Sequence, residues 1–225
     1  MNVKLLSYSQ PTEDFASMGI DDAQELIAYC ARVSNPSNQF NTETSEKLIN
    51  YLVKHQHWSP LEMVSACLEI ETTRDIARQI LRHRSFSFQE FSQRYADPTK
   101  DLDFVLREAR LQDHKNRQNS IQTDDAQLKV WWDAKQKFII DQVRSIYAEA
   151  IEKGIAKEQA RVILPEGNTV SRLYMNGTLR SWIHFISLRS ANGTQKEHQI
   201  VALACAKAIA VIFPMAASLT NHGSN

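Results

Sequence analysis

Cysteine and glycine are scarce in this sequence, and each scarcity excludes a kind of site. The three cysteines, Cys30, Cys67 and Cys205, are far apart and include no Cys-x-x-Cys pair, so neither a disulfide framework nor a cysteine zinc site is expected. Each lies in an apolar context typical of a small buried residue, and none is predicted to be a nucleophile. The six glycines form neither a Gly-x-Gly-x-x-Gly motif nor a Walker loop, which argues against a Rossmann dinucleotide fold.

Net charge and long apolar runs are also missing. The 26 basic and 26 acidic side chains balance, unlike the positive field of a protein that binds nucleic acid nonspecifically. No segment approaches the roughly 20 apolar residues that a membrane span requires, and the first residues contain too short an apolar run for a signal peptide. A soluble, cytoplasmic protein is therefore expected.

The pattern of apolar residues predicts one α+β domain over residues 1–225, with a small, mostly antiparallel sheet packed against several helices. The alternation of apolar and polar residues from Val64 to Ile70 is typical of a half-buried strand. Further strands are expected at 3–8 and 168–174. Helices are expected at 22–32, 44–55, 74–81, 125–153, 157–164 and 195–213, with another that begins at Thr178 or Ser181. The long helix over 125–153 is expected to be central, and its aromatic residues to be core or subunit contacts.

The polar segment 97–125 interrupts this pattern. A short helix is expected around 104–111, and the rest is expected to be irregular. A connection of this length is either a flexible excursion or a cover over a site, and the excursion is the favoured interpretation. His55 and His57 lie two residues apart in a turn, but no third ligand is evident, so no metal site is predicted.

One predicted helix concentrates positive charge on a single face. Arg74, Arg78 and Arg82 are four residues apart, so their side chains follow one stripe. Like charges at this spacing cost a helix about 0.2–0.5 kcal/mol per pair, so anionic groups are expected to offset them. The offset is either local, with Glu71 reaching Arg74 and Asp75 reaching Arg78, or a bound anion.

The loop after this helix carries more groups that suit phosphate. Arg84, Arg94 and His83 add cationic donors, and guanidinium groups bind phosphate oxygens in a bidentate manner. The nearby hydroxyl donors are those of Ser85, Ser87 and Ser92. A phosphorylated ligand is therefore expected at this loop.

The stretch 82–95 also resembles the signature of a known family. Arg-His-Arg is followed after seven residues by Ser92, Glu90 stands two positions before that serine, and Arg94-Tyr95 closes the segment. This pattern is similar to that of the flavin-dependent thymidylate synthases. A tripeptide alone would carry no weight, but the whole fourteen-residue pattern is strongly specific.

The similarity extends over nearly the whole chain, from position 34 to about 213. It includes His57, Ser59 and Glu62, which resemble the family's His-x-[Ser/Thr]-Pro-x-Glu segment. Met63 stands where many relatives have a second histidine, so no role is carried over to that position.

The resemblance implies an enzyme that reductively methylates dUMP to dTMP. Methylenetetrahydrofolate would donate the carbon, NADPH-reduced FAD would supply the hydride, and tetrahydrofolate would be released. Members of the family are homotetramers with active sites between subunits, so self-association and small-molecule nucleotide and folate ligands are expected, with neither nucleic acid nor membrane as a partner. Hydride chemistry delegated to a flavin needs no attacking cysteine, which fits the absence of a candidate thiol.

The resemblance also implies roles for individual residues. Arg189 is expected to be catalytic, because it would pair with the uracil carbonyl and N3 and favour the ionised pyrimidine. The residues expected to bind dUMP are Gln79, Arg82, Glu90, Ser92, Gln93, Arg94, Arg161 and Arg189. Those expected to bind FAD are Ser59, Arg82, His83, Arg84, Glu90, Thr178, Arg180 and His184. Thr178 and His184 replace asparagines that are frequent in the family, and both keep hydrogen-bonding capacity.

Two other classes of function compete with this interpretation. An RNA-binding module could stack bases on the aromatic rings that alternate with the arginines, although the balanced net charge argues against it. A structural assembly protein could use the arginine stripe to bind acidic partners. A yellow protein that NADPH bleaches without oxygen would distinguish the enzyme from both.

Overall fold

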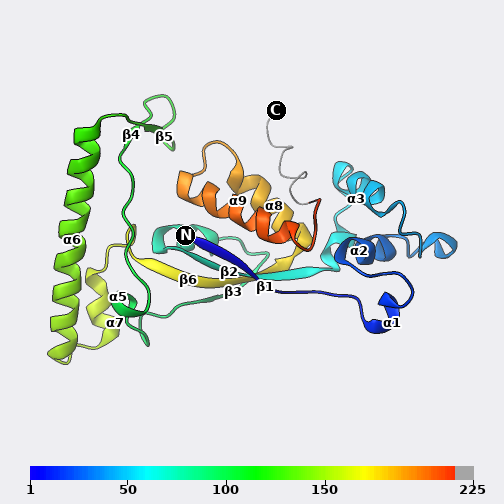
Figure 1. Ribbon diagram of the computed structural model, residues 1–225, viewed down its shortest axis with the longest axis horizontal. Coiled ribbons are helices and arrows are strands. Elements are labelled where there is room, and N and C mark those ends of the chain that lie inside the picture. The colour runs from blue at the N-terminus through cyan, green and yellow to red at the C-terminus, as the bar shows by residue number, and fades with distance from the viewer. Residues whose placement is uncertain (216–225) are drawn as a thin grey trace.

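The computed structural model describes residues 1–215, and its centre is a four-stranded antiparallel sheet (Figure 1). The strand order is β1–β2–β6–β3, and these strands comprise Asn2–Tyr8, Ser65–Thr73, Val170–Thr178 and Ser87–Glu90. The central strands β2 and β6 are aligned along their whole length, from Ser65 opposite Thr178 to Thr73 opposite Val170. The sheet confirms the predicted α+β class.

One face of the sheet is apolar because β2 alternates as predicted. Ala66, Leu68 and Ile70 are buried, and the residues between them are half-buried. Leu68 lies opposite Met175 of β6, and Ile70 lies opposite Leu173. These cross-strand pairs are buried together, so the two central strands present one continuous apolar surface.

Two helices, α8 (Leu179–Ser190) and α9 (Lys196–Ala210), cover this surface (Figure 1). Trp182 of α8 is fully buried, and its indole nitrogen donates a hydrogen bond to the carbonyl of Ala66 at 3.0 Å. Thr178 is the N-cap of α8, where its hydroxyl accepts a hydrogen bond from an amide of the first turn. The predicted start of this helix is confirmed.

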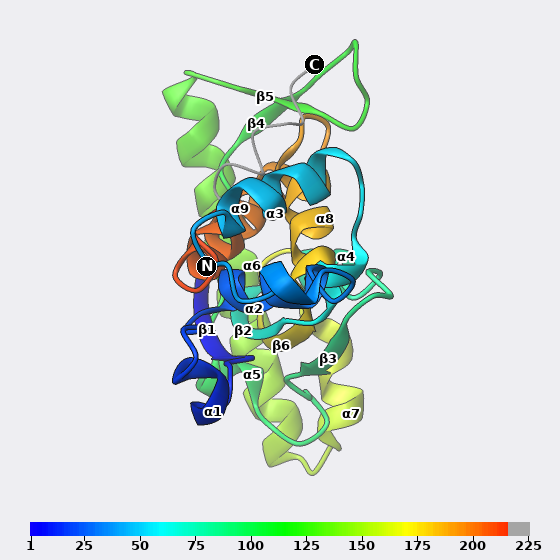
Figure 2. The ribbon, with the colours of Figure 1, turned by 90° about the vertical axis from the view of Figure 1, so that its right-hand side faces the viewer.

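Helices α2 (Ala23–Ala31) and α3 (Ser45–Lys54) pack together at one end of the sheet, close to the predicted bounds. Figure 2 views the molecule from this end, with α6 behind the sheet. Asp22 caps α2 by accepting a hydrogen bond from the Glu25 amide at 2.8 Å. The helix α4 (Arg74–Ile80) follows β2 without a connecting loop.

The predicted long helix is α6 (Ala126–Glu152), capped by Asp125. Its expected central place is wrong, because it lies at the opposite end from α2 and α3 (Figure 1). A small second cluster holds it, made of Phe104, Ile140, Val143, Tyr147, Ala160 and Leu164. Many of its other apolar side chains are exposed, namely Val130, Trp131, Trp132, Phe138, Ile139 and Ile146. A helix with this surface is only partly covered by its own subunit.

The segment 97–125 is mostly extended, and the helix expected over 104–111 is wrong. Gln136 of α6 explains the difference, because its amide donates to the Arg107 carbonyl and accepts from the Arg107 amide, both at 2.8 Å. The backbone is thus satisfied without a helix. The ordered elements of this segment are α5 (Pro98–Asp101), β4 (Arg110–Gln112) and β5 (Ser120–Gln122).

The remaining elements are short. They are α1 (Glu13–Ala16), α7 (Lys157–Ala160) and 3-10 turns at Pro36–Asn38, Ser59–Glu62 and Arg161–Ile163. The helix expected over 157–164 therefore changes to a 3-10 turn after Ala160, ahead of Pro165. Within residues 1–215, no helix is long and apolar enough to cross a membrane.

Candidate active site

The position of α4 is fixed by the strand that precedes it and by its buried face. Ile76, Ala77 and Ile80 are fully buried against the core. This packing turns Arg78 outward and leaves Arg74 half-buried. Arg74 and Arg78 therefore line the wall of the same cavity beside α4, whereas Arg82 of the predicted stripe lies beyond the end of the helix.

The arginines of α4 pair with carboxylates that are distant in sequence. Arg74 lies 3.5 Å from the Glu90 carboxylate of β3, and Arg78 pairs with Glu166. The local pairs considered from the sequence are wrong. The two carboxylates concerned are engaged elsewhere, Glu71 with Arg172 and Asp75 with Arg107.

A cavity of about 560 Å³ opens beside α4 and gathers cationic groups. Arg74, Arg78 and Arg161 line it, together with the carboxylates of Glu158 and Glu166. Three guanidinium groups against two carboxylates leave a net positive charge, which suits an anion. Arg161 reaches this wall from the 3-10 turn after α7.

Gln93 adds a polar atom without a partner to the same cavity. Its side chain is 4% exposed, and its amide Nε2 has no hydrogen-bond partner among the described residues. A buried donor left unpaired costs about 1–3 kcal/mol, so a bound acceptor would remove a real penalty. Beside it, Arg94 lies 3.2 Å from Glu158, and the Ser92 hydroxyl accepts a hydrogen bond from the Arg94 amide at 3.4 Å.

Glu90 is held at the end of β3 by contacts from two other elements. The Ser171 hydroxyl of β6 donates a hydrogen bond to its carboxylate at 2.7 Å, and Arg74 lies beside it. The pairing of β3 with β6 places Glu90 opposite Leu173. The carboxylate therefore has a fixed position next to the cationic wall.

A second group of predicted residues meets where α8 passes the loop after α4. The Arg189 Nε donates a hydrogen bond to Nε2 of His83 at 2.9 Å, and the His83 ring packs edge-on against Phe185. Burial, together with the smaller effects of the charges on Arg189, His184 and Arg82, lowers the pKa of His83 to about 4. His83 is thus neutral near pH 7, and its unprotonated Nε2 accepts the hydrogen bond from Arg189.

Phe86 anchors this loop to the sheet. Its ring is buried 4.8 Å from the Trp182 ring, measured between centroids, and lies over β6 at Gly177. A Cβ at Gly177 would come within 2.4 Å of the Phe86 ring, so glycine is needed for the close approach. Ser181 of α8 adds a hydrogen bond to the Ser85 carbonyl at 3.2 Å.

A third group lines a cavity of about 600 Å³ on the outer side of α8. Arg180, His184, Ser85 and Trp58 line it. Arg180 pairs with Glu62 at 2.6 Å, which joins the 3-10 turn Ser59–Glu62 to α8. Donors of hydrogen bonds beside an aromatic ring can hold a ring system that carries phosphate.

Most of the predicted site residues thus fall into three groups on one subunit, while Gln79 contacts Gln195 and His198. Gln93, Arg94 and Arg161 belong to the first group, with Glu90 and Ser92 beside them. His83 and Arg189 form the second, and Arg180 and His184 belong to the third. Ser59, Arg82 and Arg84 are exposed, and Thr178 is engaged as the cap of α8.

The comparisons with known proteins agree on one family. The profile of the family described as "Thymidylate synthase complementing protein" matches residues 16–215. The chain is 49% identical over 214 residues to a probable flavin-dependent thymidylate synthase of Paramecium bursaria Chlorella virus 1, covering 95% of this chain and 96% of that protein. It is also 49% identical over 218 residues to the flavin-dependent thymidylate synthase of Synechocystis, covering 97% and 98%. The chain belongs to the flavin-dependent thymidylate synthases.

A solved structure supports the family at the level of the fold. The UMP/dUMP methylase PolB from Streptomyces cacaoi, bound with 5-Br dUMP, superposes with a TM-score of 0.79 at 26% identity. The match covers 98% of this chain and 94% of that one. The resemblance of the stretch 82–95 to the flavin-dependent thymidylate synthases is therefore confirmed, and the RNA-binding alternative gains no support.

Two parts of this family member were not anticipated from its sequence. One is a chain of polar side chains that includes Gln195, Glu197 and His198, described below. A glutamate in the first turn of a helix is usually explained by its favourable charge at the helix N-terminus. That explanation gave no reason to expect that Glu197 is buried and paired with arginines. No local pattern in the sequence would have revealed these contacts.

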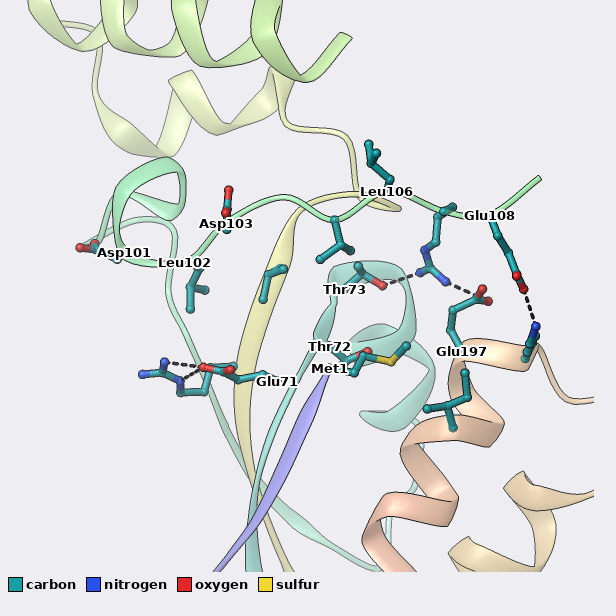
Figure 3. A pocket seen from close by; sticks show the side chains of 16 residues that line it. Met1, Glu71, Thr72, Thr73, Asp101, Leu102, Asp103, Leu106, Glu108 and Glu197 are labelled. Carbon is teal, nitrogen blue, oxygen red and sulfur yellow. Dashed lines mark hydrogen bonds and ion pairs between the residues drawn. The ribbon is translucent and has the colours of Figure 1, made fainter. Parts of the chain in front are cut away.

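The other is a cavity of about 600 Å³ between the ends of β2 and β6, the segment before β4, and α9 (Figure 3). Glu71 stands on one side and Glu197 on the other, and the apolar residues Leu102 and Leu106 line it from the segment before β4. None of the residues predicted to bind dUMP or FAD lines it.

Proposed function

We propose that this protein converts dUMP to dTMP, with methylenetetrahydrofolate as the carbon donor and FAD, reduced by NADPH, as the source of hydride. One observation carries the proposal: Nε2 of Gln93 is buried in a cavity walled by three arginines and has no hydrogen-bond partner within residues 1–215. That cavity suits an anion that also offers a hydrogen-bond acceptor, and a nucleotide phosphate is both. The family supplies the reaction.

The residues expected from the sequence to bind dUMP keep that role in the proposal, and they are Gln79, Arg82, Glu90, Ser92, Gln93, Arg94, Arg161 and Arg189. Arg161 and Gln93 already share the cationic cavity with α4. Glu90 is fixed beside it, where it can accept a hydrogen bond from a nucleotide hydroxyl.

Arg189 is proposed as the catalytic residue that meets the pyrimidine. Its Nε–H is taken up by neutral His83, so its two terminal nitrogens remain to bind a planar ligand edge. Burial, and then the charge of Arg82, lower the pKa of Arg189 from its usual range. A guanidinium with part of its water removed stabilises negative charge on the ring more strongly than one in bulk water.

We assign FAD to the residues expected from the sequence, and these are Ser59, Arg82, His83, Arg84, Glu90, Thr178, Arg180 and His184. The cavity beside α8 fits part of such a group, because Arg180, His184 and Ser85 supply donors next to the ring of Trp58. When bound, the flavin would supply the hydride. The protein contributes binding and orientation, and burial raises the pKa of all three cysteine thiols, which disfavours a thiolate nucleophile.

We further propose that residues 1–225 form one domain and that four copies assemble with their sites between subunits. The separation of the predicted residues into three groups on one subunit supports this proposal, and so does the exposed apolar surface of α6. The three free cysteines support a reducing compartment such as the cytoplasm.

An anaerobic turnover experiment tests the proposed reaction. Purified protein should bind FAD and become yellow, and NADPH should bleach it. With dUMP and methylenetetrahydrofolate carrying a labelled one-carbon unit, the label should appear in dTMP. Protein that stays colourless with added FAD and forms no labelled dTMP would refute the proposal.

A further inference from the structure

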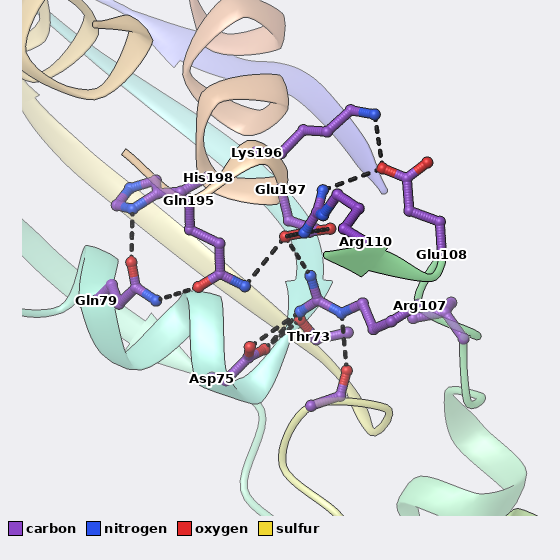
Figure 4. A network of polar contacts seen from close by, with 12 residues as sticks. Thr73, Asp75, Gln79, Arg107, Glu108, Arg110, Gln195, Lys196, Glu197 and His198 are labelled. Atoms are coloured by element: carbon purple, nitrogen blue, oxygen red, sulfur yellow. Dashed lines mark hydrogen bonds and ion pairs between the residues drawn. The ribbon is translucent and has the colours of Figure 1, made fainter. Parts of the chain in front are cut away.

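A continuous chain of hydrogen-bonded polar side chains runs from α4 to the start of α9 (Figure 4). Glu197 is 6% exposed, and its carboxylate accepts hydrogen bonds from Arg110 at 2.7 and 2.9 Å. Arg107 lies 2.8 Å from the same carboxylate. Gln195 donates a hydrogen bond to it at 3.0 Å, which begins the chain toward α4.

The chain continues through two more side chains. Gln79 donates its amide Nε2–H to the Gln195 carbonyl oxygen at 2.9 Å. The Gln79 carbonyl oxygen lies 3.1 Å from Nδ1 of His198, which is fully buried. Gln79 is the member of the chain that the family resemblance assigns to dUMP. The chain therefore joins a buried ion pair to the proposed nucleotide site.

This chain has one permitted direction. An ionised carboxylate only accepts hydrogen bonds, so Gln195 must turn its NH₂ group toward Glu197 and its carbonyl toward Gln79. Gln79 must then turn its own NH₂ group toward Gln195 and its carbonyl toward the imidazole. It follows that Nδ1 of His198 carries the ring proton and that Nε2 is an unprotonated acceptor.

Three further features agree with this direction. Burial alone would raise the pKa of Glu197, but the hydrogen bond from Arg110 and the charge of Arg107 outweigh burial and hold it at about 2, so the carboxylate stays ionised. Burial lowers the pKa of His198 to about 3, with Arg189 and His83 adding to the effect, so the ring stays neutral. Among the described residues, Nε2 of His198 has no hydrogen-bond partner.

We propose that Glu197 is a positioning residue for the nucleotide site: through Gln195 it fixes the orientation of the Gln79 amide and the tautomer of His198. The Gln79 amide then offers the ligand one remaining N–H donor and one remaining carbonyl lone pair, each with a fixed orientation. The amide cannot rotate by half a turn without breaking the chain at both ends. This inference rests on the proposed function for the identity of the ligand, but not for the direction of the chain.

The experiment uses Gln195→Met, which breaks the link and leaves the arginine pairs of Glu197 intact. Methionine is similar in size to glutamine, and the Gln195 side chain makes no cap hydrogen bond at the start of α9. Gln199→Met is the matched control, because it makes the same change on the same helix, where the amide donates hydrogen bonds to the carbonyls of Ala191 and Thr194.

Nitrogen NMR of FAD-loaded protein labelled at histidine gives the first measurement, with the His198 signal assigned from its loss in His198→Leu. We expect His198 to carry its proton on Nδ1 in the unmodified protein and in Gln199→Met. Gln195→Met should show a mixture of tautomers, because the Gln79 amide can then turn. A proton on Nε2 in the unmodified protein, or an unchanged tautomer in Gln195→Met, would overturn the inference.

Titration with dUMP gives the second measurement. The dissociation constant should rise about three- to tenfold in Gln195→Met, as for one misaligned hydrogen bond, and should not change in Gln199→Met. An unchanged constant in Gln195→Met would overturn the link to the nucleotide. If the unmodified protein bound no dUMP at all, the proposed function would fail instead, and the tautomer measurement would still decide the direction of the chain.

Discussion

The face of the sheet under α8 and α9 and the end of the sheet next to α6 differ in how much of their apolar surface the subunit itself covers. The region under α8 and α9 has a large continuous core, in which Trp182 and Phe185 are fully buried. The region around α6 has a small cluster, while Phe138 is 64% exposed and Val130 is 70% exposed. The first region can fold on its own packing, whereas the second has surface left for a partner.

Residues of the proposed active site lie in both of these regions. His83 and Arg189 rest on the large core, since Phe185 packs directly against the His83 ring. Arg161 follows Ala160 of the small cluster, and its cavity includes Leu164 of the same cluster. The proposed pyrimidine contact therefore rests on the large core of one subunit, and the proposed phosphate contact lies in a region that the proposed assembly would stabilise.

The largest expected effect comes from removing a side chain of the large core. Trp182→Ala should lower the free energy of unfolding by about 3–5 kcal/mol, because it leaves a cavity and removes the hydrogen bond to the Ala66 carbonyl. Trp131→Ala makes the same change on α6, where the side chain is 54% exposed, and should cost much less. Urea unfolding at equal protein concentration measures both, and equal losses would contradict the comparison.

Arg189→Ala tests the rigid side of the site. We expect the rate of dTMP formation to fall by about 10²–10³-fold, the usual cost of removing one preorganised electrostatic contact to a transition state. FAD should remain bound, because the proposed partner of Arg189 is the pyrimidine. Arg144→Ala, which removes a partly exposed arginine of α6 paired with Asp103, serves as the control. Turnover equal to that of the control would refute the assigned role.

The features that the sequence predicted are those decided by neighbouring residues. The alternation from Val64 to Ile70, the cap at Thr178 and the length of α6 all follow from local pattern and are confirmed. The family signature likewise lies in one continuous stretch. Such features need no knowledge of which segments meet in space.

The features that the sequence analysis missed are decided by distant residues. Asp75 pairs with Arg107 instead of Arg78, and Gln136 replaces helical hydrogen bonds around Arg107. The strand β3 was not expected within the arginine-rich stretch, because its pairing with β6 is a contact of the folded chain. Tertiary contacts overrode local preference in each case.

The exposed surface of α6 leads to the third prediction. Phe138→Asp should shift the protein from the proposed tetramer toward smaller species, since it places a charge on an apolar contact. Lys137→Asp introduces the same side chain at the neighbouring exposed position and should leave the mass unchanged. Sedimentation at a series of protein concentrations measures the change, and equal masses for both variants would show that the α6 surface is not a contact.

The smallest expected effect is on the pH dependence of stability, and it belongs to the large-core side. His83 and His198 have pKa values lowered to about 4 and about 3, mainly by burial, whereas an unfolded histidine titrates near 6.5. Between these values the unfolded state binds more protons, so the free energy of unfolding should fall as pH falls below about 6.5. The slope is at most about 1.4 kcal/mol per pH unit for each histidine.

Urea unfolding between pH 7 and pH 5 isolates this effect from the carboxylates. The pKa of Glu197 is lowered to about 2, so the stability that it contributes is present above its unfolded value and declines only at lower pH. His83→Gln keeps an acceptor for Arg189 but cannot titrate, so the slope should decrease. His114→Asn, at an exposed position far from both cores, should keep the original slope. If His83→Gln also kept the original slope, the conclusion that the folded protein holds His83 as a neutral imidazole beside Arg189 would be wrong.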